Sequence, residues 1–149
     1  MSRKLEFNEI RDIGLFKYYR TVRRWASVAY EISSADLELL MYFDCVGLFT
    51  RKDYSDGILD YTWDKRRWNR FVKDGWVVVW RERNYTTQKY NLYKTSFKTR
   101  TMITRIYKIL LGDEPLPTST KRNSIMKGKT YKDKVQKVMI KRVNSDKDR

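Results

Sequence analysis

Residues 62–93 change their periodicity once, and this change limits the fold more than any other feature of the chain. The first half has the spacing of a helix with one apolar side, formed by Trp68, Phe71 and Val72. Another side of the same helix is basic and carries Arg66, Arg70 and Lys73. Gly75 follows where a left-handed helix end would lie, and the next residues are β-branched and aromatic. We therefore expect a helix over residues 62–74 that ends at a glycine and leads into a strand.

A β-hairpin is predicted after the glycine. Residues 76–80 are rich in valine and tryptophan, and Tyr90 and Leu92 alternate with polar residues beyond a polar turn at residues 84–88. A basic helix, a glycine stop and a hairpin with a charged tip are typical of a recognition helix followed by a wing. We predict a mostly α fold with a small β-hairpin wing, an α+β class in which a winged helix-turn-helix domain is flanked by long N- and C-terminal helices.

The 149 residues, of which 41% are hydrophobic, provide one core of ordinary size and leave a charged remainder. We expect an N-terminal arm over residues 1–12, the winged-helix domain over residues 13–112 and a basic C-terminal tail over residues 113–149. Residues 118–149 contain 11 Lys and Arg against three Asp. A weak helical pattern over residues 132–143 predicts a short amphipathic helix that docks on the domain or on a partner; a solvated tail is the other interpretation.

The helix expected from Ile13 to Ile32 carries two apolar stripes. The first repeats at alternating spacings of three and four and consists of Leu15, Tyr18, Val22, Trp25, Ala29 and Ile32. The second lies beside it and consists of Phe16, Tyr19, Ala26 and Tyr30. One interpretation buries the whole helix in its own domain. The other packs one stripe on the domain and the other on a second subunit, which would make the chain a homodimer through this helix.

A second helix is predicted over residues 35–46. Ser33 and Ser34 are N-cap residues before it, and Asp36 lies in its first turn, where the helix dipole favours a negative charge. The residues that we expect this helix to bury are Leu37, Leu40, Met41 and Cys45. Because Cys45 is the only cysteine, no disulfide can form within the chain, and we expect a buried, inert thiol in a reducing compartment.

Two further helix starts follow. Thr50 and Asp53, three residues apart, indicate a capping box that opens a short helix closed by Gly57. Its distance from the helix over residues 62–74 is that of a helix-turn-helix. After the hairpin, Ser96 is the expected N-cap of a long helix that runs to residue 111.

Several classes of enzyme are excluded by composition. The chain has no histidine and one cysteine, so His-based triads, HExxH zinc sites and zinc clusters cannot form. Its six glycines form neither a P-loop nor a dinucleotide fingerprint, and we expect no enzyme activity, cofactor or metal. A row of carboxylates could hold Mg²⁺ for nuclease chemistry, but its positions at helix starts and turns favour capping: Asp53, Asp56, Asp60 and Asp64.

Two stretches, RFVKDGWVVV and LYKTSFKTR, resemble the MarR family of winged-helix transcriptional regulators. The first is similar to the family's recognition helix, which ends in a hydrophobic residue, charged residues and a glycine before a wing strand. The second is similar to its pattern of strand, threonine and helix start. The resemblance spans residues 13–111 and implies a winged-helix fold that binds DNA. The family's wing commonly carries an Asp-x-Arg pair, whereas residues 81–84 here read RERN, so the resemblance supports the fold more than dimerisation or ligand-responsive repression.

The charge balance also indicates a nucleic-acid binder. Lys and Arg number 33 against 18 Asp and Glu, which gives a net charge of +15. We expect sequence-reading contacts to double-stranded DNA in the major groove, and a role as a transcriptional regulator. The recognition-helix residues would be Thr62, Lys65, Arg66 and Asn69 near base edges, with Arg70 and Lys73 facing phosphates. The wing residues would be Arg81, Arg83, Asn84, Tyr85 and Lys89.

Two questions stay open at this point. A winged helix can also serve as an adaptor that docks on an acidic protein surface in a transcription or nucleoprotein assembly, with the basic tail as its anchor. The tryptophans are more readily explained by core and wing packing than by base stacking: Trp63, Trp68, Trp76 and Trp80. No apolar run suits a secretory signal or a membrane span, and we expect a cytoplasmic or nucleoid-associated protein without a membrane partner.

Overall fold

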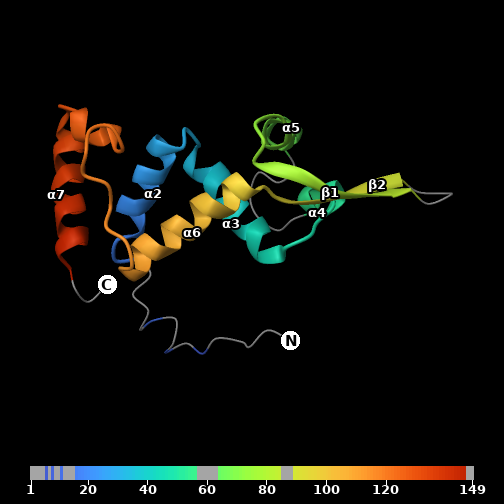
Figure 1. Ribbon diagram of the computed structural model, residues 1–149, viewed down its shortest axis with the longest axis horizontal. Coiled ribbons are helices and arrows are strands. Elements are labelled where there is room, and N and C mark those ends of the chain that lie inside the picture. Colours follow the sequence, from blue (N-terminus) through green and yellow to red (C-terminus); the bar gives the residue numbers. More distant parts are fainter. Residues whose placement is uncertain are drawn as a thin grey trace. The chain divides into compact units, whose positions relative to one another are not determined.

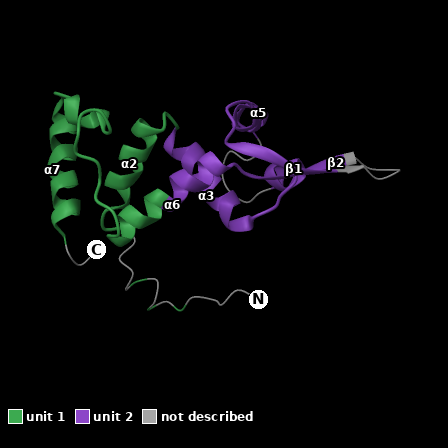
Figure 2. Cartoon of the chain, viewed as in Figure 1, with its two compact units in different colours: residues 1–32, 105–149 green, residues 33–104 purple. Residues whose placement is uncertain are grey.

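The computed structural model describes residues 6, 8, 11, 16–56, 64–84 and 89–146, and for residues 83, 84 and 89 it describes the backbone alone. The chain forms two compact units (Figures 1 and 2). Unit 1 combines Met1–Ile32 with Arg105–Arg149, and unit 2 is the continuous stretch Ser33–Thr104. The described residues are mostly helical with one small antiparallel sheet, which confirms the predicted α+β class. None of the helices in this described part is long and apolar enough to cross a membrane.

Unit 2 holds the elements that surround the basic helix. Its helices are α3 (Ser34–Val46), α4 (Arg51–Ser55) and α5 (Lys65–Lys73), and its strands are β1 (Val77–Asn84) and β2 (Lys89–Thr95). The following helix, α6 (Phe97–Leu111), begins in unit 2 and ends in unit 1. The order of elements agrees with the order expected from the sequence.

Polar side chains start the helices of unit 2 by satisfying backbone N–H groups that have no partner within the helix. The Ser33 hydroxyl accepts from the Asp36 N–H at 3.2 Å. Thr50 and Asp53 form the predicted reciprocal capping box, with bonds of 3.0 and 2.8 Å. The Asp64 carboxylate accepts from the Arg66 N–H at 2.9 Å, so α5 begins after Asp64 rather than at residue 62.

Gly75 ends α5 as the sequence indicated. Its φ of +78° lies in the left-handed region, which favours glycine. The Gly75 N–H donates to the Val72 carbonyl at 3.3 Å and the Trp76 N–H to the Phe71 carbonyl at 2.9 Å, the two bonds of a Schellman motif. This turn leads the chain from α5 into β1.

The hairpin is antiparallel and contains one irregularity. Val79 pairs with Tyr93, and Arg81 pairs with Leu92, so Trp80 is an extra residue in β1. Such an extra residue is a β-bulge, which bends the strand and changes the direction of a side chain.

A short third segment joins the edge of the hairpin. Phe49, between α3 and α4, forms an isolated antiparallel bridge with Tyr93. The Phe49 nitrogen lies 3.0 Å from the Tyr93 carbonyl oxygen, and the Tyr93 nitrogen lies 2.7 Å from the Phe49 carbonyl oxygen. The helices of unit 2 are therefore tied to the hairpin by backbone hydrogen bonds as well as by side-chain packing.

Aromatic rings from separate elements form the core of unit 2. Ring centroids lie 4.6 Å apart for Phe43 and Phe49, 5.0 Å for Tyr54 and Trp68, and 4.9 Å for Trp68 and Tyr93. Aromatic pairs at such distances add to the stability that burial provides. Trp68 fixes the inner side of α5 against this cluster.

Unit 1 contains α2 (Tyr19–Ala29), the end of α6, the 3₁₀ helix η1 (Ser124–Lys127) and α7 (Tyr131–Ser145). The helix predicted over residues 132–143 is thus present and slightly longer. Its buried side chains are Gln136, Ile140 and Val143. A solvated tail is wrong for this segment, because α7 packs back on α2. The two units also differ from the expected division into residues 1–12, 13–112 and 113–149, since unit 1 includes both α2 and α7.

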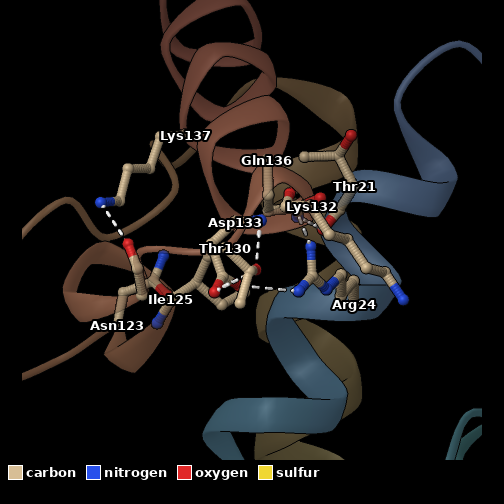
Figure 3. Close-up of polar contacts among 10 residues, drawn as sticks. Thr21, Arg24, Asn123, Ile125, Thr130, Lys132, Asp133, Gln136 and Lys137 are labelled. Atoms are coloured by element: carbon tan, nitrogen blue, oxygen red, sulfur yellow. Dashed lines mark hydrogen bonds and ion pairs between the residues drawn. The ribbon is translucent and has the colours of Figure 1, made fainter.

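Polar contacts fix the rotation of α7 (Figure 3). The Gln136 amide donates to the Thr21 carbonyl at 2.9 Å, and Arg24 Nη2 lies 2.9 Å from Asp133 Oδ1. The pKa of Asp133 is lowered from its ordinary value, because the Thr130 hydroxyl donates to the carboxylate and Arg24 pairs with it. The buried side of α7 is therefore set by specific partners on α2.

The long N-terminal helix differs from its prediction. α2 begins at Tyr19 rather than at Ile13, and residues 16–18 form a turn; Ile13, Leu15 and their neighbours at 12–15 lie outside the described residues. Val22 and Trp25 are buried by the chain itself, so the interpretation that a second subunit covers this stripe is wrong for these two residues. A homodimer through other parts of this helix stays a prediction.

The buried side of α3 also differs from its prediction. Leu37 and Leu40 are buried as expected, but Cys45 is exposed, so the expectation of a buried thiol is wrong. Leu39 and Phe43 are buried in place of Met41 and Cys45. The apolar side of this helix lies one step around its axis from the side that we expected, because the aromatic cluster takes Phe43 inward.

Candidate nucleic-acid interface

The two sides of α5 have opposite chemistry. Trp68 and Phe71 are buried. The exposed residues that can donate hydrogen bonds are Lys65, Arg66, Asn69, Arg70 and Lys73. The helix sequence KRRWNRFVK holds no acid, so this surface suits a polyanionic ligand.

Val72 does not lie with Trp68 and Phe71 on the buried side, and that expectation is wrong. Its side chain is exposed, because the inward side of α5 extends from Trp68 through Phe71 to Arg67, and Val72 lies just beyond Trp68 at the far edge of that side. The outer surface of α5 thus contains an apolar side chain among its basic ones.

An ion-pair cluster, here the Asp36 clamp, joins the start of α3 to α5 and consists of Asp36, Arg67 and Arg70. Asp36 is buried, and its Oδ1 lies 2.6 Å from Arg67 Nε while its Oδ2 lies 2.8 Å from Arg70 Nη2. The Arg67 side chain is 12% exposed and the Arg70 side chain 48%. Because a buried carboxylate requires partners, the clamp holds α5 in one rotation, with its outer residues away from α3.

Tyr54 of α4 fixes the other end of α5. Its buried hydroxyl donates to the backbone carbonyl of Asp64, the N-cap of α5, at 3.1 Å. Burial raises the pKa of Tyr54 to about 12. The start of α5 is thereby held by a hydrogen bond that needs a protonated phenol.

This contact predicts a pH dependence of stability. The Tyr54 pKa rises from 10.0 to about 12 on folding. The contribution of the Tyr54 phenol to the free energy of unfolding is therefore complete below pH 10 and is lost as the pH rises toward 12. We expect Tyr54→Phe to lower the free energy of unfolding by about 1 kcal/mol at pH 8 and to remove this alkaline loss. Urea unfolding of both proteins between pH 8 and pH 11.5 would measure it, and a constant difference between them would contradict the prediction.

The end of α5 is covered by α6. Lys98 Nζ donates to the Asp74 carbonyl at 2.8 Å and lies 3.9 Å from the centroid of the Trp76 ring. A cation at a helix C-terminus is favourable, and its position over an aromatic ring adds to this. Trp76 is buried, so its expected packing role is confirmed.

The structure brings only part of the predicted site onto one surface. Lys65, Arg66, Asn69 and Lys73 share the outer side of α5. Arg70 has a partner in Asp36 that the sequence did not indicate. Arg81 is exposed on β1. Thr62 and Tyr85 lie outside the described residues, and only the backbone is described for Arg83, Asn84 and Lys89.

The row of aspartates behaves mainly as caps in the described residues. Asp53 and Asp64 cap α4 and α5, and Asp56 occupies the end of α4. Asp60 lies outside the described residues. The carboxylates therefore fix the helices that position the basic surface.

Sequence reasoning missed the clamp, although a signal for it exists. On a helix, Arg67 lies four residues before the buried Phe71 and one before the buried Trp68, so its side chain is on the side of Phe71. An arginine at an inward position needs an acid in the core, and Asp36 was interpreted only through the helix dipole.

Comparisons of the chain with protein-family models, with curated proteins and with solved structures found no match. The interpretation of this surface therefore depends on its own geometry and charge.

Proposed function

We propose that the chain binds double-stranded DNA, with α5 as a recognition helix in the major groove and the β1–β2 hairpin as a wing. In this proposal, unit 2 is a winged helix-turn-helix in which α4 and α5 are the two helices of the motif. The observation that carries it is the outer side of α5, where exposed donors occur without an acid while Trp68 and Phe71 anchor the inner side.

Different residues of α5 would have different roles. Arginine can donate two bonds to guanine and asparagine can bond adenine in the same way, so Arg66 and Asn69 are assigned to base edges. Lys73, at the end of the helix, is assigned to phosphate, which carries charge but no sequence information. The Asp36 clamp and Tyr54 support the proposal because they hold the helix that presents these side chains.

Single substitutions on α5 test these roles. We expect Arg66→Ala to cost about 1–3 kcal/mol on the preferred duplex and little on random duplex, whereas Lys73→Ala should weaken binding to both alike. The preferred sequence would first be selected from random duplexes, and gel shifts at two salt concentrations would then give the affinities.

A matched control lies in unit 1. Arg122 is exposed there, and Arg122→Ala removes one positive charge without altering α5. It should leave the ratio of specific to random binding unchanged. Equal losses on both duplexes for Arg66→Ala, or a wild-type chain that binds no duplex, would contradict the proposed function.

We further propose that this binding regulates transcription in the manner of a MarR-like protein. The order of helix, short helix, basic helix and hairpin supports the relationship that the stretches RFVKDGWVVV and LYKTSFKTR suggested. A regulator of this kind would occupy its site in competition with, or in support of, RNA polymerase. Transcription from a template with the selected site, with and without the protein, would give the direction of the effect.

One observation favours an adaptor as a second candidate. α7 exposes an apolar stripe at helical spacing, Tyr131, Val135 and Val138, on the side opposite its buried residues. Exposed lysines flank this stripe on the same helix: Lys132, Lys134 and Lys141. An acidic, partly apolar protein surface would fit it. Absence of duplex binding in the gel shifts above would favour this candidate over the first.

A further inference from the structure

We propose that the outward face of the β1–β2 hairpin is a stacking site for unpaired bases of a single-stranded polynucleotide. The inference goes beyond duplex reading, because α5 takes no part in it. It starts from Trp80, which is 45% exposed, whereas Trp25, Trp68 and Trp76 are buried. Unlike these three, Trp80 is not a core residue, so core packing does not account for it.

The bulge determines which face Trp80 occupies. Trp80 and Arg81 together oppose Leu92, because Val79 pairs with Tyr93 and the next pair is Arg81 with Leu92. Side chains alternate between the faces of a strand, so Tyr90 and Lys94 share the face of Leu92. Tyr93 lies on the other face, where its ring contacts Phe49 and Trp68 of the core.

The outward face is therefore aromatic and basic. Tyr90 is 38% exposed, Arg81 is exposed, and Leu92 and Lys94 are half-buried. Glu82, the acid of β1, pairs with Asn91 and lies on the inward face. Within the described strands the outward face thus holds cations and rings but no carboxylate.

This chemistry favours a polynucleotide strand over other occupants. Aromatic rings stack on any unpaired base, and neighbouring cations follow the phosphates. A second copy of the chain would bring another net charge of +15 and the same basic face. A base in a duplex is already stacked on its neighbours, so an exposed indole offers more to a single strand than to a duplex.

Tryptophan fluorescence of the full chain tests the site directly. The probes are a single-stranded oligothymidylate and an abasic oligomer with the same number of phosphates. We expect the oligothymidylate to quench the fluorescence and to bind more tightly than the abasic oligomer. Trp80→Ala should abolish this part of the quenching and lower the affinity for oligothymidylate roughly 5- to 150-fold, the effect of one stacked base. Trp80→Phe, which keeps an aromatic ring, should restore part of the affinity.

Two controls separate this site from its neighbours. Val79 is exposed on the opposite face of the same strand, and Val79→Ala should leave oligothymidylate binding unchanged. Arg66→Ala should also leave the oligothymidylate quenching unchanged, so that failure of the duplex proposal and failure of this one are distinguishable. Tyr90→Ala provides a second aromatic variant on the proposed face, with the same expected direction as Trp80→Ala.

Three results would overturn the inference. The first is equal affinity for the abasic oligomer and oligothymidylate, which would leave phosphate charge as the only attraction. The second is unchanged oligothymidylate binding by a folded Trp80→Ala protein. The third is concentration-dependent self-association in light scattering that Trp80→Ala abolishes, which would assign the face to a second copy of the chain.

Discussion

Asp36→Ala is expected to lower the free energy of unfolding of unit 2 by about 3–5 kcal/mol, the usual cost of removing one partner from a buried ion pair. The loss arises because the Arg67 side chain, 12% exposed, would keep its charge without the carboxylate that lies 2.6 Å from its Nε. Urea unfolding followed by aromatic circular dichroism would measure the change. The duplex affinity of the folded fraction should fall as well, because α5 would lose its rotational constraint.

Variants of the partners make this prediction specific to the clamp. Arg70→Ala should cost less, about 1 kcal/mol, because the Arg70 side chain is 48% exposed and water can replace its contact. The double variant Asp36→Leu with Arg67→Met should recover much of the stability, since apolar side chains of similar volume can replace a buried pair. A destabilisation by Asp36→Ala no larger than that of Arg70→Ala would show that the clamp contributes little.

Val22→Glu is expected to unfold unit 1. Val22 is 0% exposed within the single chain, so glutamate would place a carboxylate without a partner in the core. A loss of more than about 4 kcal/mol is typical of this kind of change. Hydrogen exchange would show it as lost protection of the amides in α2 and α7, with protection in unit 2 retained.

Val28→Glu is the matched control, since Val28 lies on the same helix and is 39% exposed. It should change the free energy of unfolding by less than about 0.5 kcal/mol. The alternative outcome is a Val22→Glu protein that stays folded and changes from dimer to monomer in light scattering. That result would mean that this part of α2 meets a second subunit.

Local signals in the sequence were sufficient for much of unit 2. The start of α4 at the pair Thr50 and Asp53, and the end of α5 at Gly75, depend on residues within one helical turn of each other. The hairpin followed from its alternation and polar turn. These features are local, so no knowledge of distant partners was needed to predict them.

The features that the sequence did not predict depend on contacts between residues far apart in the chain. Asp36 and Arg67 are far apart in sequence, and neither residue alone indicates the other. The same holds for α7, because its weak helical pattern predicted a docked helix but did not identify the partner on α2, where the Gln136 amide donates to the Thr21 carbonyl. Charge composition describes the exposed side of such a helix and says little about the few residues on its buried side.

The sequence predicted the types of residue in the candidate site better than it predicted which of them share one surface. Lys65, Arg66, Asn69 and Lys73 lie on one exposed side because helical periodicity alone places them there. Arg70 shares much of that side and yet points to Asp36, a choice that depends on where α3 packs. The sequence did not predict that Trp80 is exposed. Its exposure depends on the bulge, and the bulge depends on the register between β1 and β2, which strand propensity does not specify.

Unit 1 is assembled from two ends of the chain, while unit 2 is continuous between them. On the ribosome, α2 is made early, but its partner α7 emerges only after all of unit 2 has been synthesised. Domains tend to fold as units during synthesis, so unit 2 can fold first and act as a preformed loop that brings the two halves of unit 1 together. During that interval the Thr21 carbonyl and Arg24 would be without their partners Gln136 and Asp133 on α7. A nascent chain stalled before Tyr131 should therefore protect unit 2 from protease while α2 is still cleaved.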